Sequence, residues 1–158
     1  MVSHSLRSLL AEHPFLEGFP PDYLNQLAEI CFEKQFQQDE IIFREADPSG
    51  FFYLILSGMV ALEITAPGRV LRIQTIGAGE ELGWSSIMDD GRKQFQARAL
   101  EPVQALAFDG IRLRALCDGD CAFGYLVLKR LLALVSERLR NTRLQLLDIF
   151  AKKGGAMK

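Results

Sequence analysis

The chain contains 158 residues, of which 49% are hydrophobic and 24% are charged, and its formal net charge is −2. This length supports a single domain with a substantial hydrophobic core, and the composition excludes an intrinsically disordered protein. The slightly acidic balance excludes a general polyanion-binding protein, so any contact with nucleic acid would require a local basic patch.

The cysteines and histidines limit the chemistry further. Cys31, Cys117 and Cys121 form no Cys-x-x-Cys pair, and the sequence shows no signal peptide and no long apolar run. We therefore expect a cytoplasmic protein with reduced thiols. His4 and His13 both lie near the N-terminus, so the sequence predicts no metal site, no haem or iron–sulfur centre and no catalytic Ser-His or Cys-His pair. We expect no enzymatic activity and no cofactor.

Two short helices are expected at the start of the chain. In residues 5–12, leucines recur at helical spacing behind Ser5, which can cap the first turn. A second helix is predicted to open at Pro20-Pro21-Asp22, because a proline suits a first helical turn, and apolar residues recur at helical spacing from Tyr23 to Ile30. We expect this second helix to pack on the strands that follow.

The apolar period changes to two in the middle of the chain. The candidate strands, separated by short turns, occupy residues 32–36, 40–43, 51–56, 59–65, 70–76, 94–100 and 103–108. Strands at a spacing of about ten residues predict an antiparallel jelly-roll β-barrel, so the fold class is mainly β with flanking helices. A parallel α/β arrangement would need a helix between strands, and none fits.

The longest predicted element is a helix over residues 121–150. It follows a short helix over residues 111–117 and the capping segment Asp118-Gly119-Asp120. At ~1.5 Å per residue the long helix measures roughly 45 Å, more than a small domain requires for its own core. We therefore divide the chain into a β-roll with N-terminal helices (1–120), a dimerisation helix (121–150) and a disordered tail (151–158).

The long helix carries a heptad seam, which we define as the positions that recur at alternating steps of four and three residues. The seam comprises Leu128, Leu132, Val135, Leu139, Thr142, Leu146 and Ile149. A second stripe, Val127, Leu131 and Leu134, is expected to pack on the β-roll. We expect the seam to bind the same helix of a second subunit and form a homodimer; the alternative is a helix that lies wholly on its own domain. Leucine at a and β-branched residues at d favour more than two strands in free coiled coils, but a larger bundle would crowd the barrels.

Residues 77–99 have the layout of a site for a small anion, and we call this segment the cassette. Gly77 and Gly79 permit positive φ, and the turn that follows them can direct N–H groups and hydroxyls at an oxyanion. Arg92 and Lys93 add two cations. The candidate ligand-binding residues are Gly79, Glu81, Leu82, Gly83, Trp84, Ser85, Ser86, Arg92, Lys93 and Gln94. The alternative is a glycine-bounded surface turn with solvated charges.

Four segments of the chain match a known family pattern. They are F-R-E-A-D at residues 43–47, F-Y-L-I-L-S-G at 52–58, the cassette, and Q-A-R-A-L at 96–100. Over residues 6–150 the chain resembles the cyclic nucleotide-binding domain of the Crp/Fnr superfamily. The resemblance implies that Ser-Gly turns a hairpin, that Glu81 accepts a ribose 2′-hydroxyl, and that an Arg-Ser/Thr pair grips the cyclic phosphate. It also implies that the long helix joins two subunits in parallel and leads into a DNA-binding domain.

The cassette departs from the family pattern in three places. Where the family has Gly-Glu-Leu, Glu80 precedes Glu81, either at the glycine position or beside an inserted residue, and this second carboxylate would repel a phosphate. Lys93 and Gln94 stand where the family has Arg and Ser/Thr, and a lysine cannot make the bidentate contact. Trp84 is larger than the usual residue and can either fill the pocket or stack on a base.

Two functions remain open at this point. The first is a regulatory sensor that binds a small anionic effector, a cyclic nucleotide being one candidate, and signals through a helical dimer. The second is an interaction protein that kept the fold and lost the ligand. Residues 151–158 are too few for a helix-turn-helix domain, so we expect no DNA binding by this chain alone and no membrane association. The basic residues of the long helix form either a solvated face or a binding patch; they are Lys129, Arg130, Arg138, Arg140 and Arg143.

Overall fold

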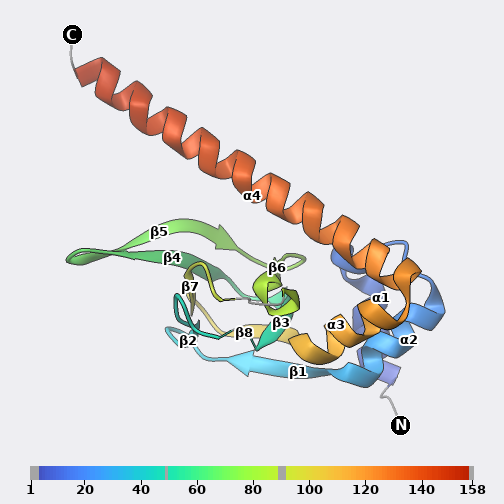
Figure 1. The fold of residues 1–158 in the computed structure, drawn as a ribbon. Helices are drawn as coiled ribbons and strands as arrows, with labels where there is room; N and C mark the ends of the chain where they lie inside the picture. The colour runs from blue at the N-terminus through green and yellow to red at the C-terminus, as the bar shows by residue number, and fades with distance from the viewer. Residues whose placement is uncertain (1–3, 49, 89–91, 157–158) are drawn as a thin grey trace.

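The structure is a computed structural model that describes residues 4–48, 50–88 and 92–156. Figure 1 shows a β-roll with short helices gathered at one end and one long helix crossing above it. The predicted class, a jelly roll with flanking helices, is confirmed. No helix in the described ranges combines the length and the apolar character needed to cross a membrane.

Two antiparallel four-stranded sheets form the roll. The first has the order β1-β8-β3-β6, with bounds Cys31–Phe36, Val103–Asp109, Phe51–Ser57 and Glu81–Leu82. The second has the order β2-β7-β4-β5, with bounds Ile41–Phe43, Gln96–Ala99, Val60–Ala66 and Arg69–Ile76. The sequence did not predict β6, because a two-residue strand is too short to show a period of two.

Strand β3 shows how the roll divides the hydrophobic core into two layers. Tyr53 and Ile55 belong to the cluster inside the roll, whereas Phe52 and Leu54 belong to the cluster between the first sheet and the helices. Successive residues of a strand point to opposite faces, so β3 is buried on both sides. The Ser-Gly turn after β3 requires its glycine: Gly58 has a φ of 91°, and a Cβ there would lie 2.3 Å from the Pro102 carbonyl oxygen.

Four α-helices and a 3-10 helix surround the outer face of the first sheet. Their bounds are His4–Glu12 (α1), Pro14–Leu16 (η1), Pro21–Ile30 (α2), Gly110–Gly119 (α3) and Cys121–Ala156 (α4). Asp120 caps α4 as expected, because its Oδ1 accepts hydrogen bonds from the Ala122 and Phe123 N–H groups at 3.0 and 3.2 Å. Phe123 is fully buried against Tyr23, with 5.1 Å between ring centroids.

Helix α4 is longer than the sequence predicted. It continues through residues 151–156, which were expected to belong to a disordered tail, and residues 157–158 lie outside the described ranges. Gly154 and Gly155 each cost only about 1 kcal/mol in a helix relative to alanine. Lys153 in the last turn favours the helix dipole, and Lys152 pairs with Asp148 at 3.5 Å.

The two faces of α4 differ in burial as the pattern predicts. The second stripe is buried, with 2% of Val127, 8% of Leu131 and 6% of Leu134 exposed. The heptad seam is exposed along its whole length, including 68% of Leu132 and 57% of Leu139. A single chain therefore leaves the seam uncovered.

Candidate functional site

The cassette begins with a tight turn that leads into β6. Gly79 has a φ of 84°, and its N–H donates to the Ile55 carbonyl at 3.0 Å. The Gly77 N–H donates to Oε2 of Glu80 at 2.7 Å. Glu80, the extra carboxylate of this cassette, is therefore held by the turn itself, and β6 then pairs with β3.

Gly83 fixes the sharp corner between β6 and the 3-10 helix η2 (Trp84–Ile87). Its φ is 85°, a conformation that residues with a Cβ rarely adopt. A Cβ at this position would lie 2.5 Å from the Phe51 carbonyl oxygen and 3.1 Å from Nζ of Lys93. The absence of a side chain here lets the cassette backbone press against β3 and leaves room for the lysine.

Lys93 is the buried cation of the cassette, with 4% of its surface exposed. Its Nζ donates to the Phe51 carbonyl at 3.3 Å and lies 4.5 Å from the centroid of the Phe43 ring. Burial lowers the pKa of Lys93 to about 8, and the charge of Asp47 partly opposes this shift. At neutral pH the ammonium group remains charged but is poorly solvated, as an anion-binding cation should be.

A cavity of about 10 Å³ lies beside Lys93. Its lining residues are Phe43, Gly83, Trp84, Ser85, Lys93, Gln94 and Phe95. Pockets that hold small organic ligands measure roughly 300–1,000 Å³, so a nucleotide cannot enter this cavity unless neighbouring groups move. The structure thus brings together four predicted site residues around a closed cation: Gly83, Trp84, Ser85 and Gln94.

Two other predicted site residues lie away from this cavity. Arg92 is exposed, and its Nη1 donates to the Ala46 carbonyl at 3.0 Å, in the loop that follows β2. Ser86 is buried, and its Oγ has no hydrogen-bond partner among the described residues. The Ser86 backbone packs against Gly110, where a Cβ would lie 2.4 Å from the Ser86 carbonyl oxygen.

Helix α4 covers the cassette with a side chain that the sequence analysis did not assign to the site. Nη2 of Arg138 donates to the Glu81 carbonyl at 2.5 Å, and its guanidinium lies 5.8 Å from the centroid of Phe95. Nη1 of Arg138 is buried without a hydrogen-bond partner among the described residues. A second contact joins α4 to the roll, because Nε2 of Gln145 donates to the Ile73 carbonyl at 2.6 Å.

The surroundings of the Glu81 carboxyl shift its pKa. Burial raises the pKa of Glu81 to about 7, the charge of Arg138 opposes the rise, and Glu80 adds to it. The sequence contained one signal for Arg138, which falls on the same helical face as Leu131 and Leu134. That spacing places it on the side of α4 that meets the roll, whereas the sequence analysis left it among residues of a solvated face or a binding patch.

Trp84 does not fill the interior of the roll. It is half-buried and packs against the hydrophobic cluster between the first sheet and the helices, while also lining the small cavity. The buried cation lies against the Phe43 ring, and Phe95, which also lines the cavity, carries the guanidinium of Arg138 over its ring.

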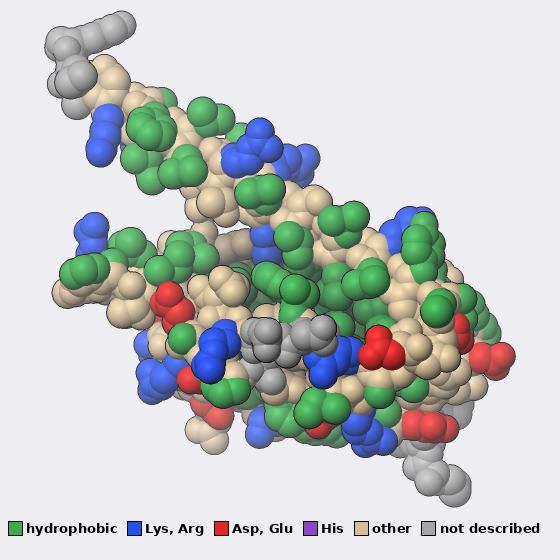
Figure 2. All heavy atoms as spheres, viewed as in Figure 1, with side chains coloured by type: hydrophobic (Ala, Val, Ile, Leu, Met, Phe, Trp, Pro, Cys, Tyr) green, Lys and Arg blue, Asp and Glu red, His purple; other side chains and the backbone are tan. Residues whose placement is uncertain are grey.

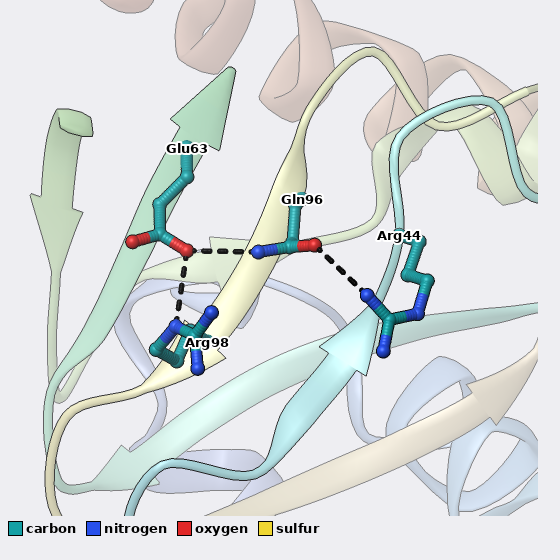
Figure 3. A network of polar contacts seen from close by, with 4 residues as sticks. All are labelled: Arg44, Glu63, Gln96 and Arg98. Atoms are coloured by element: carbon teal, nitrogen blue, oxygen red, sulfur yellow. Dashed lines mark hydrogen bonds and ion pairs between the residues drawn. The ribbon is translucent and has the colours of Figure 1, made fainter. Parts of the chain in front are cut away.

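A network of hydrogen bonds holds β7, the strand at the end of the cassette. Figure 3 shows Glu63 on β4 accepting hydrogen bonds through Oε1 from Nε2 of Gln96 at 3.0 Å and from Nε of Arg98 at 3.2 Å. Nη1 of Arg44 donates to Oε1 of Gln96 at 3.4 Å. Glu63 is only 7% exposed, so these contacts hold a buried charge and fix the position at which β7 begins.

The described residues of the cassette offer charged and polar groups and no metal-binding cluster. The described residues contain no group of three or more His, Cys, Asp or Glu side chains arranged to hold a metal ion. What the cassette provides is a buried cation, Lys93, and a half-buried carboxyl group, Glu81, whose backbone carbonyl accepts a hydrogen bond from Arg138 of α4.

Comparison with known proteins identifies the family of this domain. The profile of the family described as "Cyclic nucleotide-binding domain" matches residues 33–120. The "CRP-like cAMP-activated global transcriptional regulator" of Mycobacterium tuberculosis is 28% identical over 142 residues, which cover 89% of this chain and 62% of that protein. The chain therefore spans less than two thirds of the length of this relative.

Solved structures show the same fold. The catabolite activator protein of Thermus thermophilus superposes with a TM-score of 0.69 at 29% identity, covering 87% of this chain and 63% of that one. The regulatory subunit of a cAMP-independent protein kinase A from Trypanosoma brucei has a TM-score of 0.72 at 20% identity, covering 92% of this chain and 52% of that one.

Proposed function

The chain belongs to the family of cyclic nucleotide-binding domains, and we propose that its β-roll senses a small anionic effector while α4 carries the response to a second subunit. The observation that carries this proposal is the buried Lys93, held beside Gly83 and Ser85 in the cassette. Among the described residues no carboxylate forms an ion pair with Lys93. Burying a lysine in this way is costly, and binding an anion would offset that cost. A cyclic nucleotide is the first candidate, since the Mycobacterium tuberculosis relative is described as activated by cyclic AMP.

The contacts of Arg138 support a route from the effector to α4. The Phe95 ring lines the small cavity beside Lys93, and the guanidinium of Arg138 lies over that ring. An effector that enters beside Lys93 must displace the Phe95 ring, and with it the contact to Arg138. Displacing Arg138 from the Glu81 carbonyl would remove one of the contacts between α4 and the roll. Binding of the effector would then alter the position of the exposed heptad seam. The coupling free energy would equal the difference between the effector's binding free energies for the two positions of α4.

The closed cavity favours a second candidate, an interaction protein without an effector. A volume of about 10 Å³ holds no nucleotide, and the Thermus and Trypanosoma structures establish only that the fold is shared. The Trypanosoma kinase subunit is itself described as cAMP-independent. Under this second candidate the seam of α4 would be the functional surface.

Isothermal titration with cyclic AMP, cyclic GMP and cyclic di-GMP separates the two candidates. We expect at least one to bind, and we expect Lys93→Met to weaken that binding by on the order of 100-fold, because a charge-assisted contact of about 2.7 kcal/mol is lost. Lys93→Arg is the matched control, since it keeps the cation and should retain binding. Thermal unfolding of each unliganded variant checks that the fold is intact. If none of the three nucleotides binds, the second candidate, an interaction protein without an effector, is the function that remains.

The affinity for the bound nucleotide should be greatest between about pH 7 and about pH 8. Below about pH 7 the Glu81 carboxyl is protonated and becomes a poorer acceptor for a hydroxyl of the effector, since burial has raised its pKa. Above about pH 8 Lys93 loses its charge, since burial has lowered its pKa. Outside this window the dissociation constant should rise by up to about tenfold per pH unit on each side.

Titration calorimetry from pH 6 to pH 9 measures this profile. Glu81→Gln should remove the acidic limb and keep the alkaline one, whereas Lys93→Arg should do the reverse, because arginine stays charged throughout. If the dissociation constant of the unmodified protein does not change with pH, neither Glu81 nor Lys93 contacts the effector.

A further inference from the structure

His13 is a buried histidine outside the cassette, at the point where the chain leaves α1 and enters η1. Only 4% of its surface is exposed. On the face drawn in Figure 2, where histidine side chains are purple, no part of the ring is visible. The ring makes two hydrogen bonds: Nε2 lies 3.1 Å from the Ile55 carbonyl oxygen, and Nδ1 lies 3.2 Å from the Phe15 nitrogen. These partners belong to β3 and η1, respectively.

The two partners fix the protonation state of the ring. A carbonyl oxygen only accepts hydrogen bonds, so Nε2 must carry a proton to bind Ile55. A backbone N–H only donates, so Nδ1 must present a lone pair to Phe15, and this bond caps η1. Only the neutral Nε2–H tautomer satisfies both contacts. The charged form would bring a proton on Nδ1 against the Phe15 N–H and would place a charge where little water reaches.

The same histidine lies beside the turn that opens the cassette. The Ile55 carbonyl that binds His13 also accepts a hydrogen bond from the Gly79 N–H at 3.0 Å, and the Ile55 N–H donates to the Glu80 carbonyl at 2.9 Å. Pro14, the next residue, packs on this turn, since a Cβ at Gly79 would lie 3.3 Å from its Cγ. His13 and Pro14 therefore join the N-terminal segment, which we define as α1 and η1, to the cassette.

A positive charge on this ring would have no acidic partner among the described residues, because no carboxylate there forms an ion pair with His13. The charged side chains on the neighbouring elements are Glu12 on α1, Glu17 after η1, Glu80 in the turn, and Arg130 and Arg138 on α4. The Glu80 carboxylate already accepts a hydrogen bond from the Gly77 N–H. Burial lowers the pKa of His13 from its usual value of 6.5, and the carbonyls of Ile55 and Glu80 partly oppose this shift.

From these contacts we propose that His13 is a pH-sensitive switch for the contact between the N-terminal segment and the cassette. When the ring takes up a proton, its bond to Phe15 breaks and the charged ring moves toward water, so the cap of η1 and the bond to Ile55 are lost together. Phe15 and Leu16 remain buried, with 5.3 Å between the ring centroids of Phe15 and Phe52, so the change is local. The switch acts in the unliganded chain and does not depend on the proposed effector.

NMR spectroscopy of the imidazole groups between pH 4 and pH 8 tests the switch on the unmodified chain, which contains two histidines. His4→Gln removes the other signal and thereby assigns that of His13. We expect a neutral Nε2–H tautomer that takes up its proton below pH 6.5, and loss of exchange protection at the Phe15 amide over the same range. Amides of β8, which lies between β1 and β3, should keep their protection. A ring that titrates at or above pH 6.5, an Nδ1–H tautomer, or unchanged protection at Phe15 would overturn the proposal.

His13→Asn is the matched variant without a titrating ring. Asparagine is a strong N-cap residue whose Oδ1 accepts a hydrogen bond, so protection at Phe15 should stay constant from pH 4 to pH 8. The native pKa of His13 lies below that of the unfolded chain, so the stability it contributes is complete above pH 6.5 and is lost as the pH falls toward the native pKa. Relative to His13→Asn, the unfolding equilibrium constant of the unmodified protein should therefore rise by up to about tenfold per pH unit in that range. Urea unfolding measures both constants, and equal pH dependence in the two proteins would contradict the switch.

Discussion

Gly83→Ala is expected to destabilise the protein by about 3 kcal/mol, which lowers the melting temperature by roughly 6–12 °C in a domain of this size. The loss has two causes. The φ of 85° at Gly83 costs a residue with a Cβ about 1–2 kcal/mol. The new Cβ would also lie 2.5 Å from the Phe51 carbonyl oxygen, a backbone atom of β3 that cannot move without disturbing the sheet. Thermal and urea unfolding measure the change.

Gly68→Ala provides the matched control for Gly83→Ala. Gly68 also has a positive φ, 75°, but a Cβ there would meet nothing within 4 Å. It should therefore show the conformational cost alone, about 1 kcal/mol. If both substitutions cost the same, the cassette is not pressed against β3 as the structure describes. Because Nζ of Lys93 is the next nearest atom to the added Cβ, Gly83→Ala should also weaken effector binding more than Gly68→Ala does.

Leu132→Asp/Leu139→Asp is expected to weaken association along the seam by more than about 1,000-fold. Burying a leucine contributes about 1.5–3 kcal/mol, and each substitution acts twice in a symmetric interface. The aspartates would in addition face each other across the seam at short range. Both leucines are more than half exposed in the single chain, so the fold of each subunit should be unaffected. Analytical ultracentrifugation over a range of concentrations measures the dissociation constant.

Ala133→Asp is the control for the seam variant, because Ala133 is exposed on the same helix but lies outside the seam. It should leave the association constant unchanged. The prediction fails if the seam variant associates as strongly as the unmodified protein. In that event the exposed leucines of α4 do not join subunits.

The location of the cassette was predictable from the sequence, but its state was not. The sequence analysis placed Gly83 and Lys93 in one segment but expected positive φ at Gly77 and Gly79, whereas the structure has it at Gly79 and Gly83. The contact between Glu81 and Arg138 joins positions 57 residues apart in the chain, and no local pattern encodes it. Closure of the cavity, the side on which Trp84 packs and the direction of each pKa shift all follow from such long-range contacts.

The sequence by itself determined the order of the α-helices and of every strand except β6, the cap at Asp120, the buried stripe of α4 and the exposed seam, because hydrophobic periodicity and capping act over a few residues. The expected cap at Ser5 was wrong, because α1 begins at His4. Only the tertiary structure decided that Glu80 is held by its own turn and that Arg92 turns away from the cavity. It also decided that α4 continues to Ala156 and that Arg138 covers the site. Burial and desolvation depend on which distant segments come together, and that information exists only in the folded chain.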